Sequence, residues 1–496
     1  MKQPRFNLLY EPWIPVKKDR RTILVSLKEA LVHAHEIEAL ALASPLEEAA
    51  ITRLLLALLH RAFEGPQDEG ELKELFEKGH FPKSPLEGYL EKWQGCFYLF
   101  HPEAPFFQVA DLPNENPLPW TKLLPEFASG NNPTLFDHTF DDTPPQANFA
   151  RAARALVAHQ SFVPGGLLRR YEVSSAPGGP AAVAAVFIVQ GSNLFETLAM
   201  NLIPYSPKGD SPLWEDGPPS YRDFVGHRTK HLRTGRTRTY TWRSRAVRLL
   251  PKDKGVTLIL YGPGLYPEEK SFEPDPLFAY QANRQGYLNP VRFSEEKAFW
   301  RDFQALLPSR KEDTGRLPPK VLKIPLLLKG SPLFPLKVLG QVTDQAKVLS
   351  IRREVYPLPR RVLEEEETIE EVELVLERAE GLGSCLRRVA RALAERLLSL
   401  NYNSNSKEIT SLSRSLPLEA TYWAELDHAF PRYLAALAEN PEAAWRLWLE
   451  SLEIAARQGW EATKASIGTR ARNLKALSEG ERSFRSCLAR YVKKEA

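Results

Sequence analysis

The chain is poor in the residues that build disulfide frameworks and structural zinc sites. Three cysteines occur among the 496 residues, Cys96, Cys385 and Cys487, and no two of them form a Cys-x-x-Cys pair. This spacing argues against both a disulfide framework and a zinc site. We expect the three thiols to be buried and to pack as small hydrophobic side chains.

Long apolar runs are absent as well. No stretch of the sequence approaches the roughly 18 apolar residues that a membrane span needs. The first residues, MKQPRFNLLYEPWIPV, contain neither a continuous apolar segment nor a small-residue cleavage site, which argues against a secretory signal. These absences predict a cytoplasmic protein.

The composition is that of a folded protein with a small excess of positive charge. Hydrophobic residues make up 43% and charged residues 26% of the chain, and the formal net charge is +4. These values exclude a disordered or fibrous protein, and the length predicts two or three domains. Two methionines, three cysteines and 41 prolines indicate selection for heat tolerance.

Two regions with different patterns of apolar residues, proline and glycine predict an α+β fold. Residues 1–360 alternate helical and strand patterns irregularly, with connectors rich in proline and glycine, and predict a mixed α/β body. One helix is expected to begin after Ser44, with Pro45 in its first turn and Glu47 completing a capping box. Residues 361–496 carry apolar residues at helical spacing and predict an antiparallel four-helix bundle.

A basic run lies between Gly226 and Pro251 and contains no Asp or Glu. Tyr240 and Trp242 are interleaved with its cations. Aromatic faces beside guanidinium groups suit stacked bases and phosphates, so we favour nucleic-acid binding over a solvated strand face. The cations are Arg228, Lys230, Arg233, Arg236, Arg238, Arg243, Arg245 and Arg248.

The segment VTDQAKVLSIRR, residues 342–353, predicts a β-hairpin. Two runs of strand formers flank Thr343-Asp344-Gln345-Ala346, which has the composition of a turn. On these residues alone, a surface hairpin linking two layers is the simplest interpretation. Arg352 and Arg353 at its foot would either contact phosphates or help the hairpin to pack.

Catalytic motifs are missing from the sequence. It contains no P-loop, no Gly-x-Ser-x-Gly and no dinucleotide fingerprint, so we predict a binding protein without a cofactor or resident metal. The alternative is a stand-alone metal-dependent nuclease that uses Asp137, His138, Asp141 and Asp142. Their spacing matches no known ligand pattern, and the surrounding GNNPTLFDHTFDDTPPQ has the composition of an exposed loop.

Several segments, in order, resemble the CasA family, the large subunit of the type I-E CRISPR surveillance complex called Cascade. They span roughly the first 360 residues, and the region after them resembles the family mainly in being helical. The matching segments are FNLLYEPWIPV (6–16), HRAFEGP (60–66), GHFPKSPLEGYLEKWQGCFYLFHPEAPFFQ (79–108), ASGNNPTLFDHTFDD (128–142), GSNLFETLAMNL (191–202), DSPLWED (210–216), YTWRSR (240–245) and DQAK (344–347).

The resemblance implies a non-catalytic protein that inspects duplex DNA for a protospacer-adjacent motif, from the minor groove, before the strands open. The corresponding motif and wedge residues here are Gly165, Gly166, Lys270, Asp344, Gln345 and Ala346. A loop with Asn131, Asn132, Leu135 and Phe136 would dock onto the guide RNA and neighbouring subunits. The implied partners are other Cascade subunits, guide RNA, target DNA and a helicase-nuclease, and we expect a monomer when the chain is isolated.

Overall fold

The structure is a computed structural model that describes residues 5–127, 144–227, 229–268, 273–308, 315–328, 331–399, 405–468 and 470–492. The chain divides into two compact units. The first comprises Met1–Glu296, Ser309–Gly330 and Pro335–Val355; the second comprises Lys297–Pro308, Ser331–Phe334 and Tyr356–Ala496. The second unit therefore includes two short segments that precede the helical region in the sequence.

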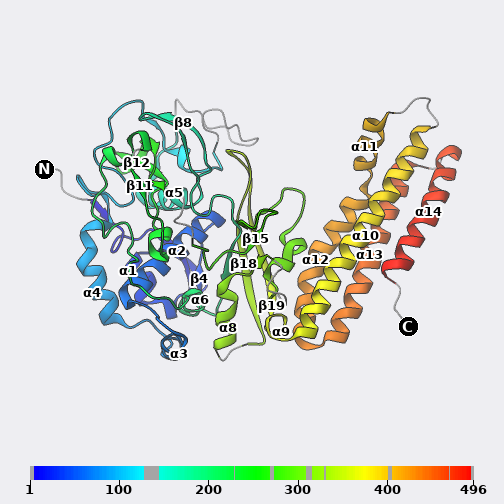
Figure 1. Cartoon of the computed structure of the whole chain (residues 1–496), viewed down its shortest axis with the longest axis horizontal. Helices are drawn as coiled ribbons and strands as arrows, with labels where there is room; N and C mark the ends of the chain where they lie inside the picture. The colour runs from blue at the N-terminus through cyan, green and yellow to red at the C-terminus, as the bar shows by residue number, and fades with distance from the viewer. Residues whose placement is uncertain are drawn as a thin grey trace. The chain divides into compact units, whose positions relative to one another are not determined.

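The first unit mixes helices with small sheets (Figure 1). Its helices are α1 (Leu27–Val32), α2 (Pro45–Phe63), α3 (Glu69–Glu77), α4 (Lys83–Trp93), α5 (Phe149–Phe162), α6 (Leu194–Asn201), α7 (Arg236–Tyr240) and α8 (Ile324–Leu327). The predicted mixed α/β character of this region is confirmed.

The strands of this unit form short sheets rather than one large one. The β2–β4 sheet has the order β3-β2-β4, with β2 at Ile14–Lys18, β3 at Arg21–Val25 and β4 at Ala39–Leu40. A second sheet has the order β12-β13-β6, with β7 also pairing β13; its strands are β6 (Leu118–Pro119), β7 (Ala147–Asn148), β12 (Arg245–Lys252) and β13 (Gly255–Pro263). A third has the order β10-β18-β19, with β10 at Val186–Val189, β18 at Leu333–Asp344 and β19 at Lys347–Pro359.

The remaining strands of the first unit pair in twos and threes. They are β1 (Arg5–Asn7) with β5 (Tyr98–Phe100), β8 (Gly166–Arg170) with β9 (Val173–Ala176), β11 (Lys230–His231) with β14 (Tyr266–Pro267), and β15 (Tyr280–Ala282) between β16 (Leu288–Pro290) and β17 (Arg316–Leu317). Short, separate sheets leave many connecting loops, and the site described below is built mainly on such loops.

Helix α2 lies in the core of the first unit. Nearly all of its side chains are buried, including the guanidinium of Arg53. Arg53 pairs with Asp275 at 2.6 Å and lies over the rings of Tyr240 and Phe278 at 4.3 and 5.2 Å from the ring centroids. A buried cation is tolerated because a carboxylate and two aromatic faces replace its water.

The start of α2 corrects one sequence prediction. Ser44 is the N-cap residue and Pro45 begins the helix, but the side chain of Ser44 makes no capping hydrogen bond. Glu47 instead pairs with Arg154 of α5 at 3.2 Å, so the capping box does not form. Burial raises the pKa of Glu47, against the lowering effect of Arg154.

The second unit is helical, as predicted. Its helices are α9 (Arg361–Glu364), α10 (Glu366–Ser399), α11 (Ser406–Ser415), α12 (Pro417–Glu439), α13 (Pro441–Ile467) and α14 (Ala471–Tyr491), and the 3₁₀ segment η6 (Phe299–Leu306) also belongs to it. The four long helices α10, α12, α13 and α14 pack on one another (Figure 1). Helix α10 continues through Gly381 and Gly383, and α11 is a further short helix that the sequence analysis did not predict.

A disulfide within the helical unit contradicts the cysteine prediction. Cys385 of α10 and Cys487 of α14 are bonded, although 102 residues separate them in the sequence. The two helices pack side by side and bring the thiols together, which spacing along the chain cannot show. Cys96 is a free cysteine, and burial raises the pKa of its thiol.

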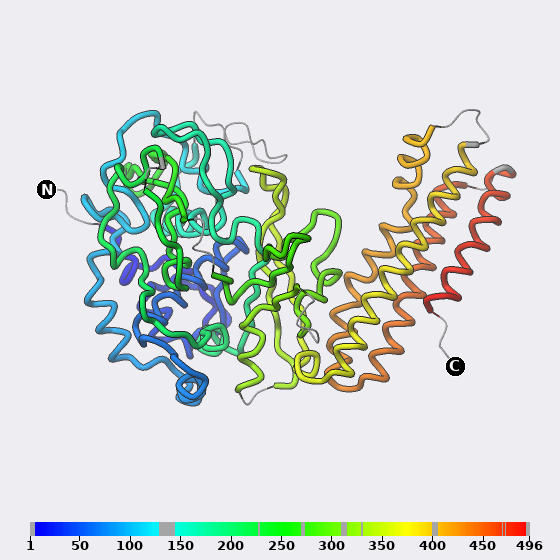
Figure 2. Tube along the Cα trace, viewed as in Figure 1, coloured from blue at the N-terminus to red at the C-terminus, as the bar shows by residue number. Residues whose placement is uncertain are grey.

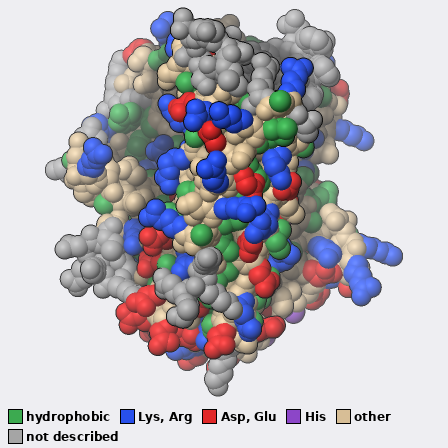
Figure 3. Space-filling view, turned by 90° about the vertical axis from the view of Figure 1, so that its right-hand side faces the viewer, with side chains coloured by type: hydrophobic (Ala, Val, Ile, Leu, Met, Phe, Trp, Pro, Cys, Tyr) green, Lys and Arg blue, Asp and Glu red, His purple; other side chains and the backbone are tan. Residues whose placement is uncertain are grey.

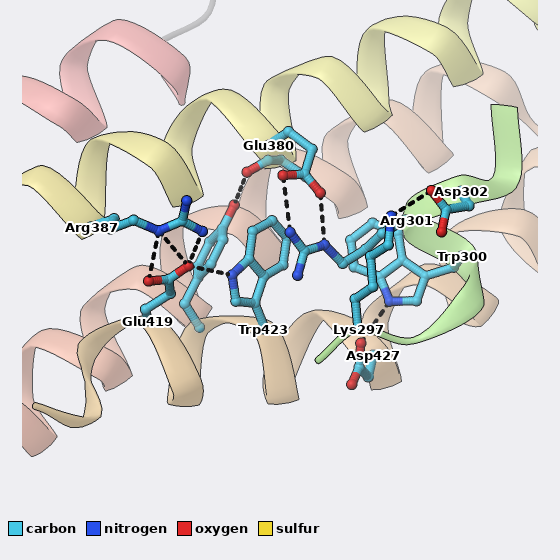
Figure 4. Close-up of polar contacts among 11 residues, drawn as sticks. Lys297, Trp300, Arg301, Asp302, Glu380, Arg387, Glu419, Trp423 and Asp427 are labelled. Atoms are coloured by element: carbon cyan, nitrogen blue, oxygen red, sulfur yellow. Dashed lines mark hydrogen bonds and ion pairs between the residues drawn. The ribbon is translucent and has the colours of Figure 1, made fainter. Parts of the chain in front are cut away.

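Polar contacts attach η6 to the long helices of the same unit (Figure 4). Arg301 pairs with Glu380 at 2.7 Å and lies 3.6 Å from the ring centroid of Trp423. The indole of Trp300 donates to Asp427 at 2.6 Å. An arginine between a carboxylate and an indole makes both a salt bridge and a cation–π contact, so it fixes the segment more firmly than charge alone would.

Basic and acidic side chains are mixed on the face that Figure 3 shows, with carboxylates more frequent toward its lower edge. Elsewhere in the helical unit, exposed charges form pairs one helical turn apart, such as Arg391 with Glu395 and Arg457 with Glu453. Exposed pairs of this kind contribute little to stability individually. The pattern is that of a solvated helical surface.

Candidate nucleic-acid interface

The hairpin predicted around residue 345 is present, and its arms are longer than the sequence indicated (Figure 2). Strands β18 and β19 are neighbours in one sheet and are joined by a two-residue turn. Asp344, Gln345 and Ala346 are all exposed. Gln345 has a φ of 51°, so its backbone adopts the left-handed conformation. The turn therefore presents an uncharged amide at the tip.

The glycine loop lies directly against this tip. Helix α5 ends at Phe162, and the chain then passes through Val163 and Pro164 to Gly165 and Gly166 at the start of β8. A Cβ on Gly166 would lie 2.8 Å from the Cβ of Ala346, which is closer than van der Waals contact. The structure thus brings the glycine loop and the hairpin tip together, although about 180 residues separate them in the sequence.

Gly165 is equally restricted. A Cβ there would lie 2.8 Å from the backbone nitrogen of Gly178. Loop closure is reinforced by the amide of Gly179, which donates to the carbonyl of Val163 at 2.8 Å. A side chain is excluded at Gly165 because the backbone of Gly178 occupies the space.

Two side chains anchor the hairpin to the body of the first unit. Gln341 of β18 donates its amide N–H groups to the carbonyls of Phe162 and Ala182, at 2.7 and 2.8 Å. The buried carboxylate of Glu48, on α2, contacts Lys337 at 2.6 Å and Arg353 at 2.8 Å. Because Lys337 and Arg353 lie on opposite arms of the hairpin, Glu48 connects both arms to the core helix.

These contacts decide between the two interpretations of the arginine pair at the foot of the hairpin. Arg353 also donates to the carbonyl of Leu42 at 2.7 Å. Arg352 donates to the carbonyl of Glu295 at 3.1 Å and contacts Glu354 at 3.6 Å. Both arginines are therefore engaged in packing the hairpin.

Most arginines of the basic run, for which the sequence favoured nucleic-acid binding, make contacts within the protein. Arg245 is buried and donates to the carbonyls of Pro164 and Pro177, at 2.7 Å each, so it supports the glycine loop from beneath. Arg236 is buried, donates to the carbonyls of Ile203 and Pro204, and lies over the ring of Tyr205.

The aromatic residues of the run are also buried. Trp242 packs in a hydrophobic cluster with Phe224 and Leu260, and Tyr240 lies against Arg53. Neither ring is available to stack on a base. The expectation of interleaved aromatic stacking is therefore wrong for this segment, because tertiary contacts placed the rings in the core.

An acid from outside the run compensates one of the other arginines. Arg238 pairs with Asp216 at 2.8 Å, and the carboxylate of Asp210 accepts from the amides of Thr237 and Arg238. Burial lowers the pKa of Arg243 to about 10 and also lowers the pKa of Arg233, which lies over Trp242. Arg243 therefore stays charged near neutral pH.

The other members of the run differ in exposure. Lys230 is exposed on β11 and Arg248 is half-buried on β12. Arg228 lies outside the described residues. The basic run thus serves mainly to hold the first unit together, with one arginine fixing the glycine loop.

Several predicted site residues lie outside the described residues. They are Lys270, the docking-loop residues Asn131, Asn132, Leu135 and Phe136, and the acidic and histidine cluster of the alternative function, Asp137, His138, Asp141 and Asp142. Among the residues that the structure describes, no group of three His, Cys, Asp or Glu side chains is placed to hold a metal ion.

Three exposed residues beside the site were missed by the sequence analysis. Leu167 follows the glycine loop and is 81% exposed. Arg169 is exposed two residues further along β8, and Lys347 is exposed immediately after the hairpin turn. A large exposed apolar side chain close to two cations suits contact with a nucleic acid, whose bases are apolar on their faces and whose backbone is anionic. The dispersed sequence positions of these residues gave no signal.

In the part of the chain that the structure describes, no helix combines the length and apolarity required to cross a lipid bilayer.

Comparison with known proteins agrees with the resemblance noted in the sequence. The family model for the CRISPR-associated protein Cse1 matches residues 7–461. The CRISPR-associated protein CasA/Cse1 of Thermus thermophilus is 49% identical over 488 residues, which cover 97% of this chain and 96% of that protein.

Solved structures show the same fold. A structure of Thermus thermophilus CasA (Cse1) has a TM-score of 0.88 and 47% identity, covering 98% of this chain and 100% of that one. Thermobifida fusca Cse1 has a TM-score of 0.82 at 23% identity, covering 99% and 98%. A chain of a CRISPR RNA-guided surveillance complex has a TM-score of 0.77 at 22% identity, covering 97% and 100%. With a family model that spans most of its length and a relative that is nearly half identical, this chain belongs to the Cse1 family of CRISPR-associated proteins.

Proposed function

We propose that this chain is the non-catalytic large subunit of a type I-E CRISPR surveillance complex, and that it recognises a protospacer-adjacent motif in duplex DNA and begins strand separation. The observation that carries the proposal is the contact between the glycine loop and the hairpin tip. Gly166 lies against Ala346, beside the exposed amide of Gln345. A groove-reading element and a wedge would thus act on adjacent base pairs.

The chemistry of the tip suits entry into the minor groove. The two glycines of the loop permit close approach of the backbone, and the minor groove offers a degenerate pattern of acceptors. The Gln345 amide can hydrogen-bond to base edges without repelling phosphate. Leu167 supplies the apolar surface that minor-groove proteins insert between base steps. Arg169 and Lys347 would contact the backbone, and Lys270 stays a predicted motif contact.

A rigid mounting is required because opening a base pair is unfavourable. Unstacking one step costs on the order of a few kcal/mol, and a hairpin that bends under that load would not open the pair. Glu48 and Gln341 tie the hairpin to α2 and to the end of α5. Once the first pair is open, exchange of DNA pairing for guide pairing is nearly balanced in energy, so a local wedge can decide whether unwinding begins.

The partners follow from the family. We infer that the chain works with other surveillance-complex subunits and a guide RNA, and that it helps to recruit a helicase-nuclease after opening. The structural relative in a CRISPR RNA-guided surveillance complex supports this assignment through its fold. The loop containing Asn131, Asn132, Leu135 and Phe136 is the proposed contact with the guide RNA. The isolated chain is proposed to be a monomer.

The proposal is tested by replacing the tip residue in the reconstituted complex. Gln345→Ala should leave initial duplex binding nearly unchanged and reduce guide-dependent opening, measured as permanganate reactivity of thymines next to the motif. Lys73→Ala, on the distant helix α3, is a matched surface control that should open DNA like the unchanged complex. Equal opening rates for the Gln345 variant and the control would reject the wedge.

Family membership favours this binding role over the alternative of a stand-alone nuclease. The alternative assigns cleavage to Asp137, His138, Asp141 and Asp142. Incubation of the purified chain with duplex DNA and Mg²⁺ or Mn²⁺ separates the two functions. Cleavage that disappears in Asp137→Asn would support the nuclease and count against the proposal.

A further inference from the structure

A cavity of about 200 Å³ lies beneath the glycine loop and the hairpin tip. Gly166, Leu167 and Ala346 are among its lining residues, so the cavity borders the hairpin tip. Its walls include the apolar side chains of Leu46 and Phe162. No step of the proposed function uses this cavity.

Several polar groups of the lining are already engaged within the protein. His159 bonds the carbonyl of Leu123 at 3.0 Å and the hydroxyl of Tyr261 at 2.9 Å. Burial lowers the pKa of His159 to about 3, so the ring is neutral. Arg245 donates to three backbone carbonyls. These groups shape the cavity and leave little capacity for a ligand.

Two lining residues carry an oxygen that has no hydrogen-bond partner among the described residues. They are Ser44, with its buried hydroxyl, and Gln341, whose amide oxygen is free although its nitrogen bonds two carbonyls. Gln341 is only 2% exposed. A buried acceptor without a partner is unfavourable by about 1–3 kcal/mol. Both oxygens are shielded from solvent and do not face the cavity, so the surface that a ligand can touch is mainly apolar.

The size of the cavity restricts the ligand further. It is smaller than the roughly 300–1,000 Å³ of sites for drug-sized ligands, yet it holds several times the roughly 30 Å³ share of one water. A planar heterocycle fits this range, whereas a nucleotide with its phosphate does not. Lys122, Arg245 and Glu126 also line the cavity, so its charged groups have both signs, with cations in excess.

We infer that this cavity receives the nucleobase that the hairpin releases from the first opened pair of the DNA. The inference rests on the proposed function, since the base must first be unpaired. A base held between the apolar walls cannot pair again, so the cavity would make opening persist. Extruded bases are generally bound between apolar side chains.

The experiment uses the reconstituted complex and a duplex with 2-aminopurine next to the motif, placed on one strand or the other. A captured base should be unstacked, and therefore fluorescent, yet protected from acrylamide quenching. Leu168→Trp adds bulk to the lining and should raise the quenching constant several-fold. Val355→Trp adds the same bulk at an exposed position of β19 and should not.

The outcomes separate this inference from the proposed function. Permanganate reactivity without acrylamide protection on either strand would overturn capture of the base while leaving strand opening intact. The absence of permanganate reactivity would reject opening itself. Protection of 2-aminopurine placed in the guide RNA, before DNA is added, would show that the cavity holds an RNA base and would also overturn the inference. Equal quenching in Leu168→Trp and Val355→Trp would reject the cavity as the binding place.

Discussion

Loss of the Glu48 carboxylate should loosen the hairpin at both arms. Its side chain is 6% exposed, and it contacts Lys337, at 15% exposure, and Arg353, at 35%. Removing one partner of a buried ion pair costs about 3–5 kcal/mol, because the remaining charge stays desolvated. Arg353 reaches solvent and keeps its bond to the carbonyl of Leu42, so we expect Glu48→Gln to destabilise the hairpin by roughly 3 kcal/mol.

The measurement is native-state hydrogen exchange followed by mass spectrometry of peptides from β18 and β19. A loss of about 3 kcal/mol corresponds to an opening equilibrium raised roughly 100-fold, since each 1.4 kcal/mol is a factor of ten. Adding Lys337→Met to Glu48→Gln should recover much of the protection, because no buried ammonium then lacks its carboxylate. Glu36→Gln, at an exposed pair with Lys18, is the control and should leave exchange unchanged.

The reasoning fails if Glu48→Gln exchanges at the same rate as the unchanged protein in both strands. A slower exchange in the double variant than in the unchanged protein would show that the ion pairs oppose packing, as some buried pairs do. A uniform change over the whole first unit would indicate that α2, rather than the hairpin, depends on this carboxylate.

Four further results are expected. Cys487→Ser should lower the stability of the helical unit by about 2–4 kcal/mol in thermal melts under non-reducing conditions, and equal melts would contradict a role for the disulfide. Because burial lowers the pKa of His159 to about 3, its stabilising contribution is present above pH 6.5 and is lost as the pH falls toward 3. Between pH 6 and pH 4 the free energy of unfolding, measured in denaturant melts, should therefore fall by roughly 2 kcal/mol less in His159→Gln than in the unchanged protein. Arg236→Met should destabilise the first unit by about 2 kcal/mol, because it removes buried hydrogen bonds. Arg169→Met should leave the stability unchanged and weaken duplex binding at low salt. Weaker duplex binding in Arg236→Met without a loss of stability would instead identify the basic run as a DNA contact. Gly166→Val should displace the hairpin tip and reduce strand opening without a large change in melting temperature, and unchanged opening would show that the loop and the tip act separately.

Local patterns predicted the elements well where the signal lies within a few residues. The turn at Asp344 to Ala346 and the helices from residue 366 onward follow from turn composition and from apolar spacing, and both are present. The start of α2 was placed correctly by Ser44 and Pro45. The capping box failed because Arg154, more than 100 residues away, competes for Glu47.

The candidate site was harder to predict because long-range contacts decide it. Arg245 belongs to a run without acids, yet it is buried because backbone carbonyls of Pro164 and Pro177 receive its N–H groups. Every residue has a backbone carbonyl, so the sequence does not show which carbonyls will accept hydrogen bonds from a side chain. The disulfide between Cys385 and Cys487 depends in the same way on how two helices align. The proximity of Gly166 to Ala346 was implied only by the family resemblance.

The backbone of Gln345 has one more consequence. A side chain in the left-handed conformation costs about 1–2 kcal/mol relative to glycine, which adopts it freely. The folding of this turn alone would therefore select Gly or Asn at its apex, so a long amide there is kept against the conformational preference of the chain. Gln345→Gly should consequently give a protein that folds at least as well as the original, and any activity it loses can be ascribed to the missing amide rather than to a damaged turn.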